Sequence, residues 1–397
     1  MNKRLNQTLS ILRSNKHFHV KKVNAMLLLL PMGLGDAVLF LDTIDYYFKM
    51  PGQNRKIIIM TTISANKVFR FARPDLNYEF FGYDPVKMDM DSNYFMKCLK
   101  RLGSRKYDVI VYPLRGFLTM DLLFGKLKAD IKVTLNTIKE GSKKNIKIWL
   151  RDQLIKNSTI LQFQPWDMDL IRYARIAEIV CKKKIKAKLP KIEIDKVNVK
   201  APYCLVSIGS SKIEKCWPSN RYGELANYVL SHTNSNIMFT GSKEDRKEVE
   251  HLVEALEPKE RIINRCGETS IEELFEIVAG AQVLIGNDSG PIHIAAAVNT
   301  PAICIVGGWD YERVYPYKVE IAEENRPTPI IINTGYKNCY RCLMLYGKRG
   351  AMNSQCAEMI REGKPCLCID DISSGLVIEC LRRILREEEV SEAQCHI

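Results

Sequence analysis

The sequence predicts an α/β protein made of two doubly wound domains, each with a mostly parallel sheet covered by helices. Three observations support this fold class. Short apolar runs alternate with stretches of helical periodicity in both halves of the chain. The alternation fades in a lysine-rich stretch at 181–200, where we place the interdomain linker. The length of 397 residues also exceeds what one hydrophobic core usually organises.

We expect three parts along the chain. Residues 1–195 form a first Rossmann-like domain, and residues 196–371 form a second one that includes a late cysteine-containing segment. A final helix and tail follow at 372–397. In the second domain, Ser270 and Glu273 have the spacing of a capping box that opens a helix at 271–279. The other expected elements are strands at 26–30, 56–60, 107–112, 203–208, 236–240, 261–264, 282–286 and 302–306, and helices at 37–48, 291–298 and 372–386.

The composition, 46% hydrophobic and 26% charged, is that of a soluble globular protein and excludes an intrinsically disordered chain. No apolar run approaches the roughly 18 to 20 residues that span a bilayer. The N-terminal stretch lacks the apolar core and small-residue cleavage site of a signal peptide. We therefore expect a cytoplasmic protein whose 13 cysteines are reduced.

The formal net charge of +13 calls for an anionic partner. Nucleic acid, a phospholipid surface and a phosphorylated substrate all satisfy that requirement, and charge alone does not choose among them. Nucleic acid is disfavoured because the chain has no recognisable binding motif and no platform of interleaved aromatic and basic residues. The sequence also lacks the G-x-S-x-G, Walker and H-E-x-x-H motifs of common hydrolases, NTPases and zinc proteases.

The turn Asn287-Asp288-Ser289-Gly290-Pro291 leaves a predicted buried strand and enters a helix. Ligands of such sheets bind beyond the carboxyl ends of the strands. At that place Ser289 and Gly290 expose backbone N–H groups at a helix N-terminus, where the helix dipole favours a phosphate. The turn is therefore a candidate diphosphate cradle. The alternative is a helix capped by Asp288 or Ser289 that binds nothing.

A second loop, at 209–218, follows another predicted strand of the same sheet and ends in Trp217-Pro218, with the proline suited to a first helical turn. Lys215 stands just before this anchor, so its ammonium group is a candidate ligand of the same phosphates. The alternative is an ordinary solvated lysine, as loop lysines usually are.

In the first domain, Gly33, Gly35 and Asp36 lie on the first strand-to-helix turn, where an α/β domain usually meets its ligand. A dinucleotide-binding fingerprint fits poorly, because Val38 stands at the position of the third glycine. Asp36 is either a chemically active carboxylate or the N-cap of the following helix.

Five cysteines lie late in the chain, and they include one C-x-x-C pair. Such a set can hold a structural zinc ion, although the spacings after the pair are irregular. The alternative is a set of buried or exposed thiols. These residues are Cys339, Cys342, Cys356, Cys366 and Cys368.

Three segments together resemble the ADP-heptose:lipopolysaccharide heptosyltransferases of glycosyltransferase family 9. They are GLGDAVL after the first strand, KCWP after the linker, and GNDSGPIHIAAAVNTPAICIVGG in the second domain. The resemblance implies a GT-B architecture, in which two Rossmann-like domains face each other across a cleft. The donor would bind in the C-terminal domain and the acceptor in the N-terminal domain. The final helix would pack back toward the N-terminal domain.

By position, the resemblance makes Asp36 the general base that deprotonates the acceptor hydroxyl, with Gly33 and Gly35 in the acceptor-side loop. It makes Lys215 a ligand of the donor phosphates. An acid is also expected against the ribose, where Asp245 matches weakly and Glu244 is the alternative. The phosphate-binding turn would be Asp288, Ser289 and Gly290, with His293 one helical turn further on.

The implied reaction is the inverting, metal-independent transfer of a heptose from ADP-heptose to a lipopolysaccharide core acceptor or related glycolipid, without a cofactor. The expected partners are the nucleotide sugar and an anionic glycolipid such as a lipid A-linked core. The protein would meet this acceptor peripherally at the inner face of the cytoplasmic membrane. The alternatives are transfer of another nucleotide sugar, or a catalytically silent relative that binds a nucleotide or glycan.

Overall fold

The computed structural model describes ten stretches of the chain. None of the described helices is long and apolar enough to cross a membrane. The described residues are 23–51, 55–114, 117–136, 152–164, 167–194, 201–308, 310–311, 313–321, 326–333 and 354–385.

By its internal contacts the chain divides into two compact units. Most of the first half forms unit 1 and most of the second half forms unit 2, and the chain passes finally into unit 2 after Lys186. That point lies inside the stretch predicted to be the linker. Two short pieces from the first half, Leu34–Asp42 and Pro165–Leu170, group with unit 2.

The sheet of unit 1 has six parallel strands in the order β3-β2-β1-β4-β5-β6. Its central strands are almost continuously buried, as expected for a parallel sheet covered on both faces. The strands are β1 Ala25–Leu30, β2 Lys56–Thr61, β3 Glu79–Gly82, β4 Tyr107–Tyr112, β5 Ala129–Leu135 and β6 Thr159–Leu161.

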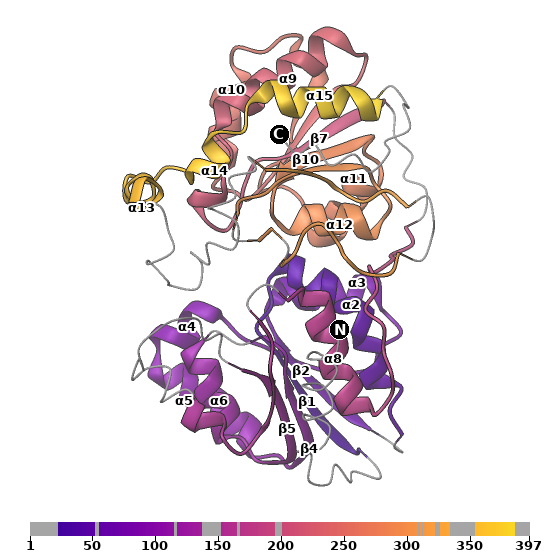
Figure 1. The fold of residues 1–397 in the computed structure, drawn as a ribbon, viewed down its shortest axis with the longest axis vertical. Coiled ribbons are helices and arrows are strands. Elements are labelled where there is room, and N and C mark those ends of the chain that lie inside the picture. The colour runs from indigo at the N-terminus through magenta and orange to yellow at the C-terminus, as the bar shows by residue number, and fades with distance from the viewer. Residues whose placement is uncertain are drawn as a thin grey trace, which may run out of the picture. The chain divides into compact units, whose positions relative to one another are not determined.

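In the described part of the chain, helices α2 to α6 and α8 accompany the first sheet, and α2 and α8 each lie partly in unit 2 (Figure 1). Side chains cap several of them: the Oγ1 of Thr62 accepts from Ala65 N, and the carboxylate of Asp91 accepts from Asn93 N and Tyr94 N. The helices are α2 Leu34–Phe48, α3 Ile63–Ala72, α4 Pro85–Met90, α5 Ser92–Gly103, α6 Leu118–Lys126 and α8 Asp169–Cys181.

The sheet of unit 2 repeats this plan with six parallel strands in the order β12-β11-β10-β7-β8-β9. Strand order reverses beside β7, and β7 and β10 are neighbours, so the loops that follow them lie at the same edge of the sheet. The strands are β7 Tyr203–Ser207, β8 Asn236–Thr240, β9 Ile262–Asn264, β10 Val283–Asn287, β11 Ala302–Ile305 and β12 Ile330–Ile332.

The helices of unit 2 include one with the predicted capping box: Ser270 accepts from Glu273 N, and the Glu273 carboxylate accepts from Ser270 N. Two 3₁₀ turns, Ile213–Lys215 and Lys259–Arg261, precede Trp217 and β9. The helices are α9 Ser219–His232, α10 Arg246–Val253, α11 Ile271–Ala279, α12 Gly290–Ala297, α13 Ser354–Arg361, α14 Leu367–Asp370 and α15 Ser374–Leu385.

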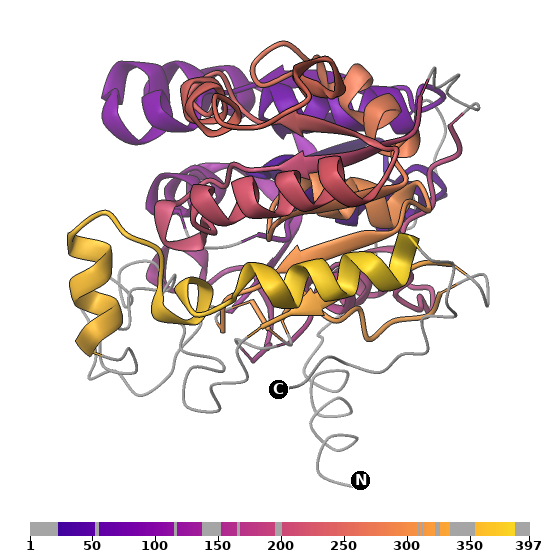
Figure 2. The ribbon, with the colours of Figure 1, turned by 90° about the horizontal axis from the view of Figure 1, so that it is seen from above.

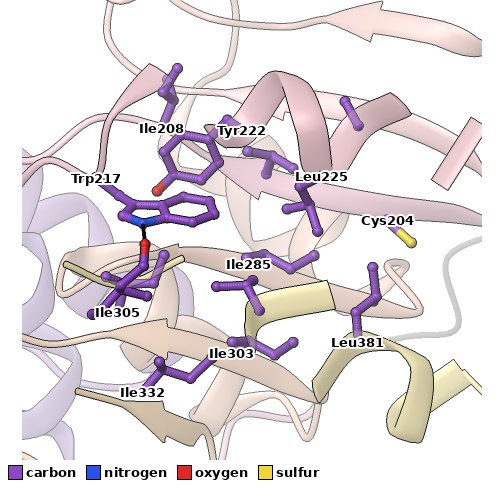
Figure 3. Close-up of a cluster of buried hydrophobic side chains, with 14 of the residues drawn as sticks. Cys204, Ile208, Trp217, Tyr222, Leu225, Ile285, Ile303, Ile305, Ile332 and Leu381 are labelled. Carbon is purple, nitrogen blue, oxygen red and sulfur yellow. Dashed lines mark hydrogen bonds between the residues drawn. The ribbon is translucent and has the colours of Figure 1, made fainter. Parts of the chain in front are cut away.

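Trp217 stands in the core of unit 2, 2% exposed, with its ring edge-to-face against Tyr222 at a centroid distance of 4.8 Å (Figure 3). Its indole Nε1 donates to the carbonyl oxygen of Ile372 at 2.7 Å. Trp217 therefore connects the loop after β7 to the segment that leads into the last helix.

The last helix, α15, packs against α9 and β11 of unit 2, and Leu381 lies in the core of that unit. Figure 2 shows α15 running beside α9. That the final helix also packs toward the first domain stays a prediction, and residues after Leu385 lie outside the described chain.

Candidate functional site

Asn287 holds the two candidate loops of unit 2 together. It ends β10 and is fully buried. Its Nδ2 donates to the carbonyl oxygen of Ile208 at 2.7 Å, and its Oδ1 accepts from the backbone N of Trp217 at 2.9 Å. One side chain therefore fixes both ends of the loop after β7 against the turn that starts at Asp288.

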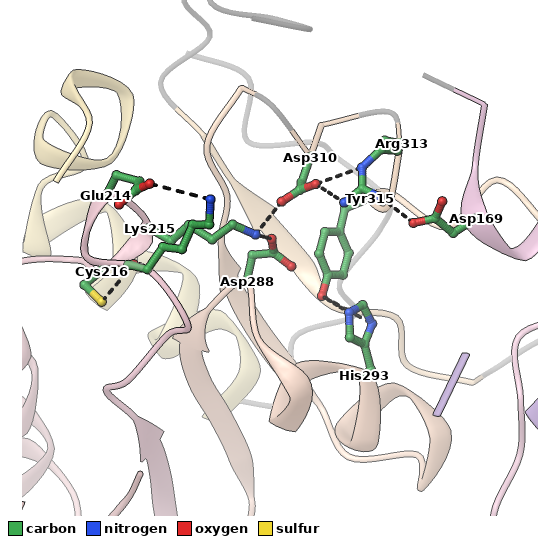
Figure 4. A network of polar contacts seen from close by, with 10 residues as sticks. Asp169, Glu214, Lys215, Cys216, Asp288, His293, Asp310, Arg313 and Tyr315 are labelled. Carbon is green, nitrogen blue, oxygen red and sulfur yellow. Dashed lines mark hydrogen bonds and ion pairs between the residues drawn. The ribbon is translucent and has the colours of Figure 1, made fainter. Parts of the chain in front are cut away.

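Lys215 is buried, with only 9% of its surface exposed, so the alternative of a solvated loop lysine is wrong. Its Nζ lies 2.7 Å from Oδ2 of Asp288 and 2.6 Å from Oδ2 of Asp310 (Figure 4). The 3₁₀ turn and the Trp217 anchor point the side chain inward. The ammonium group therefore lies beside Asp288, just before α12 begins, where the sequence predicts a phosphate site.

Asp310 and Arg313 are site residues that the sequence analysis did not identify. Asp310 is fully buried, and its Oδ1 accepts from Arg313 Nε at 2.9 Å and from Arg313 Nη2. Arg313 also pairs with Asp169, through Nη1 and Oδ2 at 2.6 Å. The sequence signal that could have identified them is their place after a predicted strand. They follow β11, which pairs with β10, so their loop lies beside the Asp288 turn.

The pKa values of this cluster are shifted in different directions. Burial works against the ammonium of Lys215, but Asp288 and Asp310 outweigh it and raise the pKa of Lys215. Burial also works against the carboxylate of Asp310, yet Arg313 and Lys215 hold its pKa well below the usual range. The pKa of Asp288 is raised, first by burial and further by Asp310. Asp288 is therefore the member of the pair that accepts a proton more readily.

His293 lies on α12 one turn after the phosphate-binding candidate, and it is buried and neutral. Its ring stacks on Tyr315 with an interplanar angle of 3°, and its Nδ1 lies 2.7 Å from the hydroxyl of Tyr317. Burial lowers the pKa of His293 to about 3. A neutral imidazole held between two tyrosines is not a cationic phosphate ligand at neutral pH, so its contribution is shape and hydrogen bonding.

The first turn of α12 is not closed by a side chain. Ser289 occupies the N-cap position but makes no capping hydrogen bond, and its Oγ is buried without a partner among the described residues. Asp288 is engaged by Lys215 instead. The sequence alternative of a helix capped by either side chain is therefore wrong, and the backbone N–H groups at Ser289 and Gly290 retain no side-chain cap.

Asp245 occupies the N-cap position of α10, and its Oδ2 accepts from Ser242 N at 2.7 Å. The same oxygen would stand 2.8 Å from a Cβ added to Gly241, and a Cβ on Gly209 would also collide with it. The carboxylate therefore lies between the loop after β7, which also carries Lys215, and the loop after β8. Glu244, the alternative acid, is exposed.

Asp36 is half-buried and lies in the first turn of α2, two residues after the helix begins at Leu34. Gly33 takes the N-cap position, so the alternative of Asp36 as the N-cap is wrong. Gly35 groups with unit 2 and is close-packed there: an added Cβ would stand 2.5 Å from Cδ2 of His293. Glycine at position 35, in the first turn of α2, leaves room for the His293 ring, which would have to shift for any larger residue.

Three of the five late cysteines lie in the described part of the chain, and one of them contacts the loop after β7. Cys356, Cys366 and Cys368 are buried free thiols in the core of unit 2, and Cys366 N donates to Glu214 O at 3.0 Å. Cys339 and Cys342 lie outside the described residues. Within the ten described stretches, no group of three or more His, Cys, Asp or Glu side chains is arranged to hold a metal ion.

Comparison with known proteins connects this geometry to one family. The family described as "Glycosyltransferase family 9 (heptosyltransferase)" matches residues 95–326, which is more than half of the chain. The lipooligosaccharide heptosyltransferase 2 of Haemophilus influenzae is 36% identical over 95 residues. That alignment covers 23% of this chain and 27% of the relative, so the chain matches about a quarter of that relative's length.

Solved structures share the fold. A glycosyl transferase family 9 protein from Veillonella parvula superposes with a TM-score of 0.64 at 18% identity, covering 92% of this chain and 98% of that one. The ADP-heptose lipopolysaccharide heptosyltransferase II of Escherichia coli gives a TM-score of 0.59 at 15% identity, covering 92% and 99%. The predicted fold class, GT-B with two parallel α/β sheets, is confirmed.

Proposed function

The chain belongs to glycosyltransferase family 9, and from this premise we propose that it transfers a heptose from ADP-heptose to a lipopolysaccharide core acceptor. The names of the relatives support the donor and the acceptor class. The observation that carries the proposal is the buried ammonium of Lys215, held 2.7 Å from Asp288 at the start of α12. A cation and a helix N-terminus at one sheet edge form a site for a diphosphate.

In this proposal the donor diphosphate lies between Lys215 and the backbone N–H groups of Ser289 and Gly290. As the bond to the anomeric carbon breaks, negative charge develops on the leaving ADP. The lysine and the helix dipole are already oriented toward that charge in a desolvated site, so they stabilise the transition state more than the ground state. Asp245 takes the ribose, which its place beside the loop after β7 supports.

Asp36 is the proposed general base. It removes the proton of the acceptor hydroxyl while that oxygen attacks the anomeric carbon from the face opposite the diphosphate, which inverts the configuration. Asp36 is half-buried in the first turn of α2, so the helix sets the position of its backbone while part of the residue stays accessible. Gly33 is the N-cap residue of α2 and Gly35 lies in its first turn, so both stand directly before the proposed base in the acceptor-side loop that we propose.

The proposed reaction needs no metal ion or other cofactor. Lys215 and the N-terminal end of α12 supply the positive charge that a divalent ion provides in many other phosphate-transfer sites. Activity that survives dialysis against a chelator, with the protein's metal content then measured, is the expected result. Activity that is lost and returns only with an added metal contradicts this part of the proposal.

The proposed acceptor is an anionic glycolipid such as a lipid A-linked core, met peripherally at the inner face of the cytoplasmic membrane by a cytoplasmic enzyme. The net charge of +13 supports an anionic partner. Heptose transfer is favoured over transfer of another sugar because the relatives' names specify heptosyltransferases.

Mass spectrometry of the products formed from ADP-heptose and a panel of truncated core acceptors tests the proposal. A mass increase of one heptose on one acceptor is expected. Thermal-shift measurements with ADP and UDP provide a second test, in which ADP should stabilise the protein more. A preference for UDP excludes ADP-heptose as the donor, and nucleotide binding without any turnover indicates a catalytically silent protein.

A further inference from the structure

Five large apolar side chains of unit 1 are exposed on three helices that follow one another in the chain. Val86 and Met90 belong to α4, Met96 lies in the second turn of α5, and Phe117 and Leu118 stand at the start of α6. Between 45% and 83% of each residue is exposed. Scattered exposed apolar residues need no explanation, so the meaning of these five depends on whether they lie together.

The packing of the three helices brings these side chains to one side of unit 1 (Figure 1). Helix α4 packs on α5, and α5 packs on α6. The Thr119 hydroxyl donates to the Asp89 carboxylate, so the first turn of α6 lies beside the end of α4. A grouped apolar surface of this kind marks a binding face. We name the five apolar residues, together with the exposed lysines Lys87, Lys97 and Lys100, the α4–α6 surface.

The α4–α6 surface begins at the carboxyl edge of the first sheet. Helix α4 follows β3, and α6 follows β4, which pairs with β1. The proposed base, Asp36, comes after β1, and the carboxyl ends of parallel strands lie at one edge of a sheet. A lipid acceptor has to present its hydroxyl to Asp36 while its acyl chains stay in the bilayer. A surface that docks on that bilayer is therefore expected at this edge.

Lysines stand among the apolar groups of this surface. Lys97 and Lys100 line a hollow of about 520 Å³ beside Met96. Helix α5 contains these two lysines and Arg101 but no acid. Lysine is depleted from protein–protein interfaces, whereas an anionic lipid leaflet attracts it. The composition of the surface therefore favours a lipid partner over a protein partner.

The acids on the same stretch are engaged within the protein. Asp84 and Asp91 accept from backbone N–H groups at the starts of α4 and α5, where the helix dipoles are positive. Asp89 accepts from Thr119. These contacts offset part of the negative charge of the acids, whereas the three lysines of the surface are exposed to solvent.

We infer, resting on the lipid acceptor proposed above, that the α4–α6 surface docks on a bilayer that contains anionic phospholipid. Its apolar side chains enter the boundary between headgroups and acyl chains, and its lysines pair with the lipid phosphates. No covalent bond forms or breaks in this step. Docking holds unit 1 at the membrane, so that an embedded acceptor meets the edge of the sheet after which Asp36 comes.

Cosedimentation of the full chain with vesicles tests the inference. Vesicles of phosphatidylcholine and phosphatidylglycerol in a three-to-one ratio should bind the chain, and vesicles of phosphatidylcholine alone should bind it much less. Lys97→Gln/Lys100→Gln should weaken binding to the anionic vesicles roughly 25-fold, from about fivefold for each lysine. Met90→Ser should weaken it about tenfold, because an apolar side chain that enters the bilayer is lost.

Lys106→Gln/Lys128→Gln is the matched control. It removes the same charge from exposed lysines that directly precede β4 and β5, at the opposite edge of the sheet. This variant should bind the anionic vesicles within about twofold of wild type, because charges beyond the Debye length are screened. Thermal unfolding of each variant checks that it is folded. Equal losses in the two lysine pairs would assign the attraction to the charge of the whole protein and overturn the inference.

Two other results also overturn it. One is a wild-type chain that does not bind anionic vesicles, or surface variants that bind them as wild type does. The other is a change of oligomeric state in Met90→Ser without vesicle binding by wild type, which would identify a second copy of the chain as the occupant of the surface.

Turnover distinguishes this inference from the proposed function. The ratio of heptose transfer to a vesicle-embedded acceptor over transfer to an acyl-free core acceptor should fall in Lys97→Gln/Lys100→Gln and stay constant in the control pair. Transfer by a wild-type chain that does not bind vesicles overturns the docking surface alone. Vesicle binding through this surface without transfer to any acceptor overturns the proposed function alone.

Discussion

Lys215 and Asp310 form an ion pair of 2.6 Å although they are 95 residues apart in the sequence. Lys215 comes from the 3₁₀ turn after β7, and Asp310 comes from the loop after β11. Strand β10 lies between these two strands in the sheet and ends at Asn287, directly before Asp288. The parallel order of three strands therefore assembles the cluster that we assign to the donor.

Replacing Lys215 by methionine should abolish most of the turnover. The change removes the cation that faces the leaving diphosphate, and loss of one such electrostatic contact typically costs about 10²- to 10³-fold in kcat. Steady-state kinetics with ADP-heptose measure the effect. Lys212→Met, at an exposed lysine of the same loop, is the control and should stay within a few-fold of wild type. A Lys215→Met protein that folds and keeps full activity would remove the basis of the donor assignment.

Asp36→Asn should separate catalysis from nucleotide binding. An amide cannot accept the acceptor proton, so kcat should fall about 10²- to 10⁴-fold, whereas the Kd for ADP should change little. Rapid-quench kinetics and ADP titration together measure both quantities. Comparable turnover in the variant and the wild type would show that another group is the base.

Asn287→Ala should destabilise the protein and weaken donor binding at the same time. The substitution leaves the buried Ile208 carbonyl and the Trp217 N–H without their partners, at a cost of about 2 to 3 kcal/mol. Urea denaturation gives the free energy of unfolding. Asn220→Ala, at an exposed position in the first turn of α9, should change that free energy by less than about 0.5 kcal/mol. Equal effects of the two substitutions are incompatible with the bridging role.

His293 should make the folded state sensitive to acid. Burial lowers the pKa of His293 to about 3 from an ordinary 6.5, so the unfolded chain binds the proton first as the pH falls. The stability contributed by the neutral ring is complete above pH 6.5 and is lost between about 6.5 and 3, at up to about 1.4 kcal/mol per pH unit.

His293→Gln should remove this slope, whereas His251→Gln, at an exposed histidine, should keep it. The quantity to measure is the difference between variant and wild type in the free energy of unfolding as a function of pH, because other groups change the stability in the opposite direction. Burial raises the pKa of Asp42 to about 6, so its contribution is lost as the pH rises from about 4 to 6. An unchanged acid slope in His293→Gln contradicts the buried, neutral ring.

The sequence by itself determined the α/β class and most element positions in the two sheets. Strands β4 and β8 and helix α11 have the predicted bounds, because apolar runs and the Ser270 capping box are local signals that neighbouring residues satisfy. It also singled out Lys215 and the Asp288 turn, because each follows a buried strand and precedes a helix.

Only the tertiary structure decided what these residues touch. The burial of Lys215, the part played by Asp310 and Arg313, and the packing of α15 on α9 depend on which strands lie side by side. No periodicity within one segment encodes a contact between loops 95 residues apart. The charge state of Asp288 follows from that same assembly, because burial and a neighbouring acid shift its pKa only after the chain has folded.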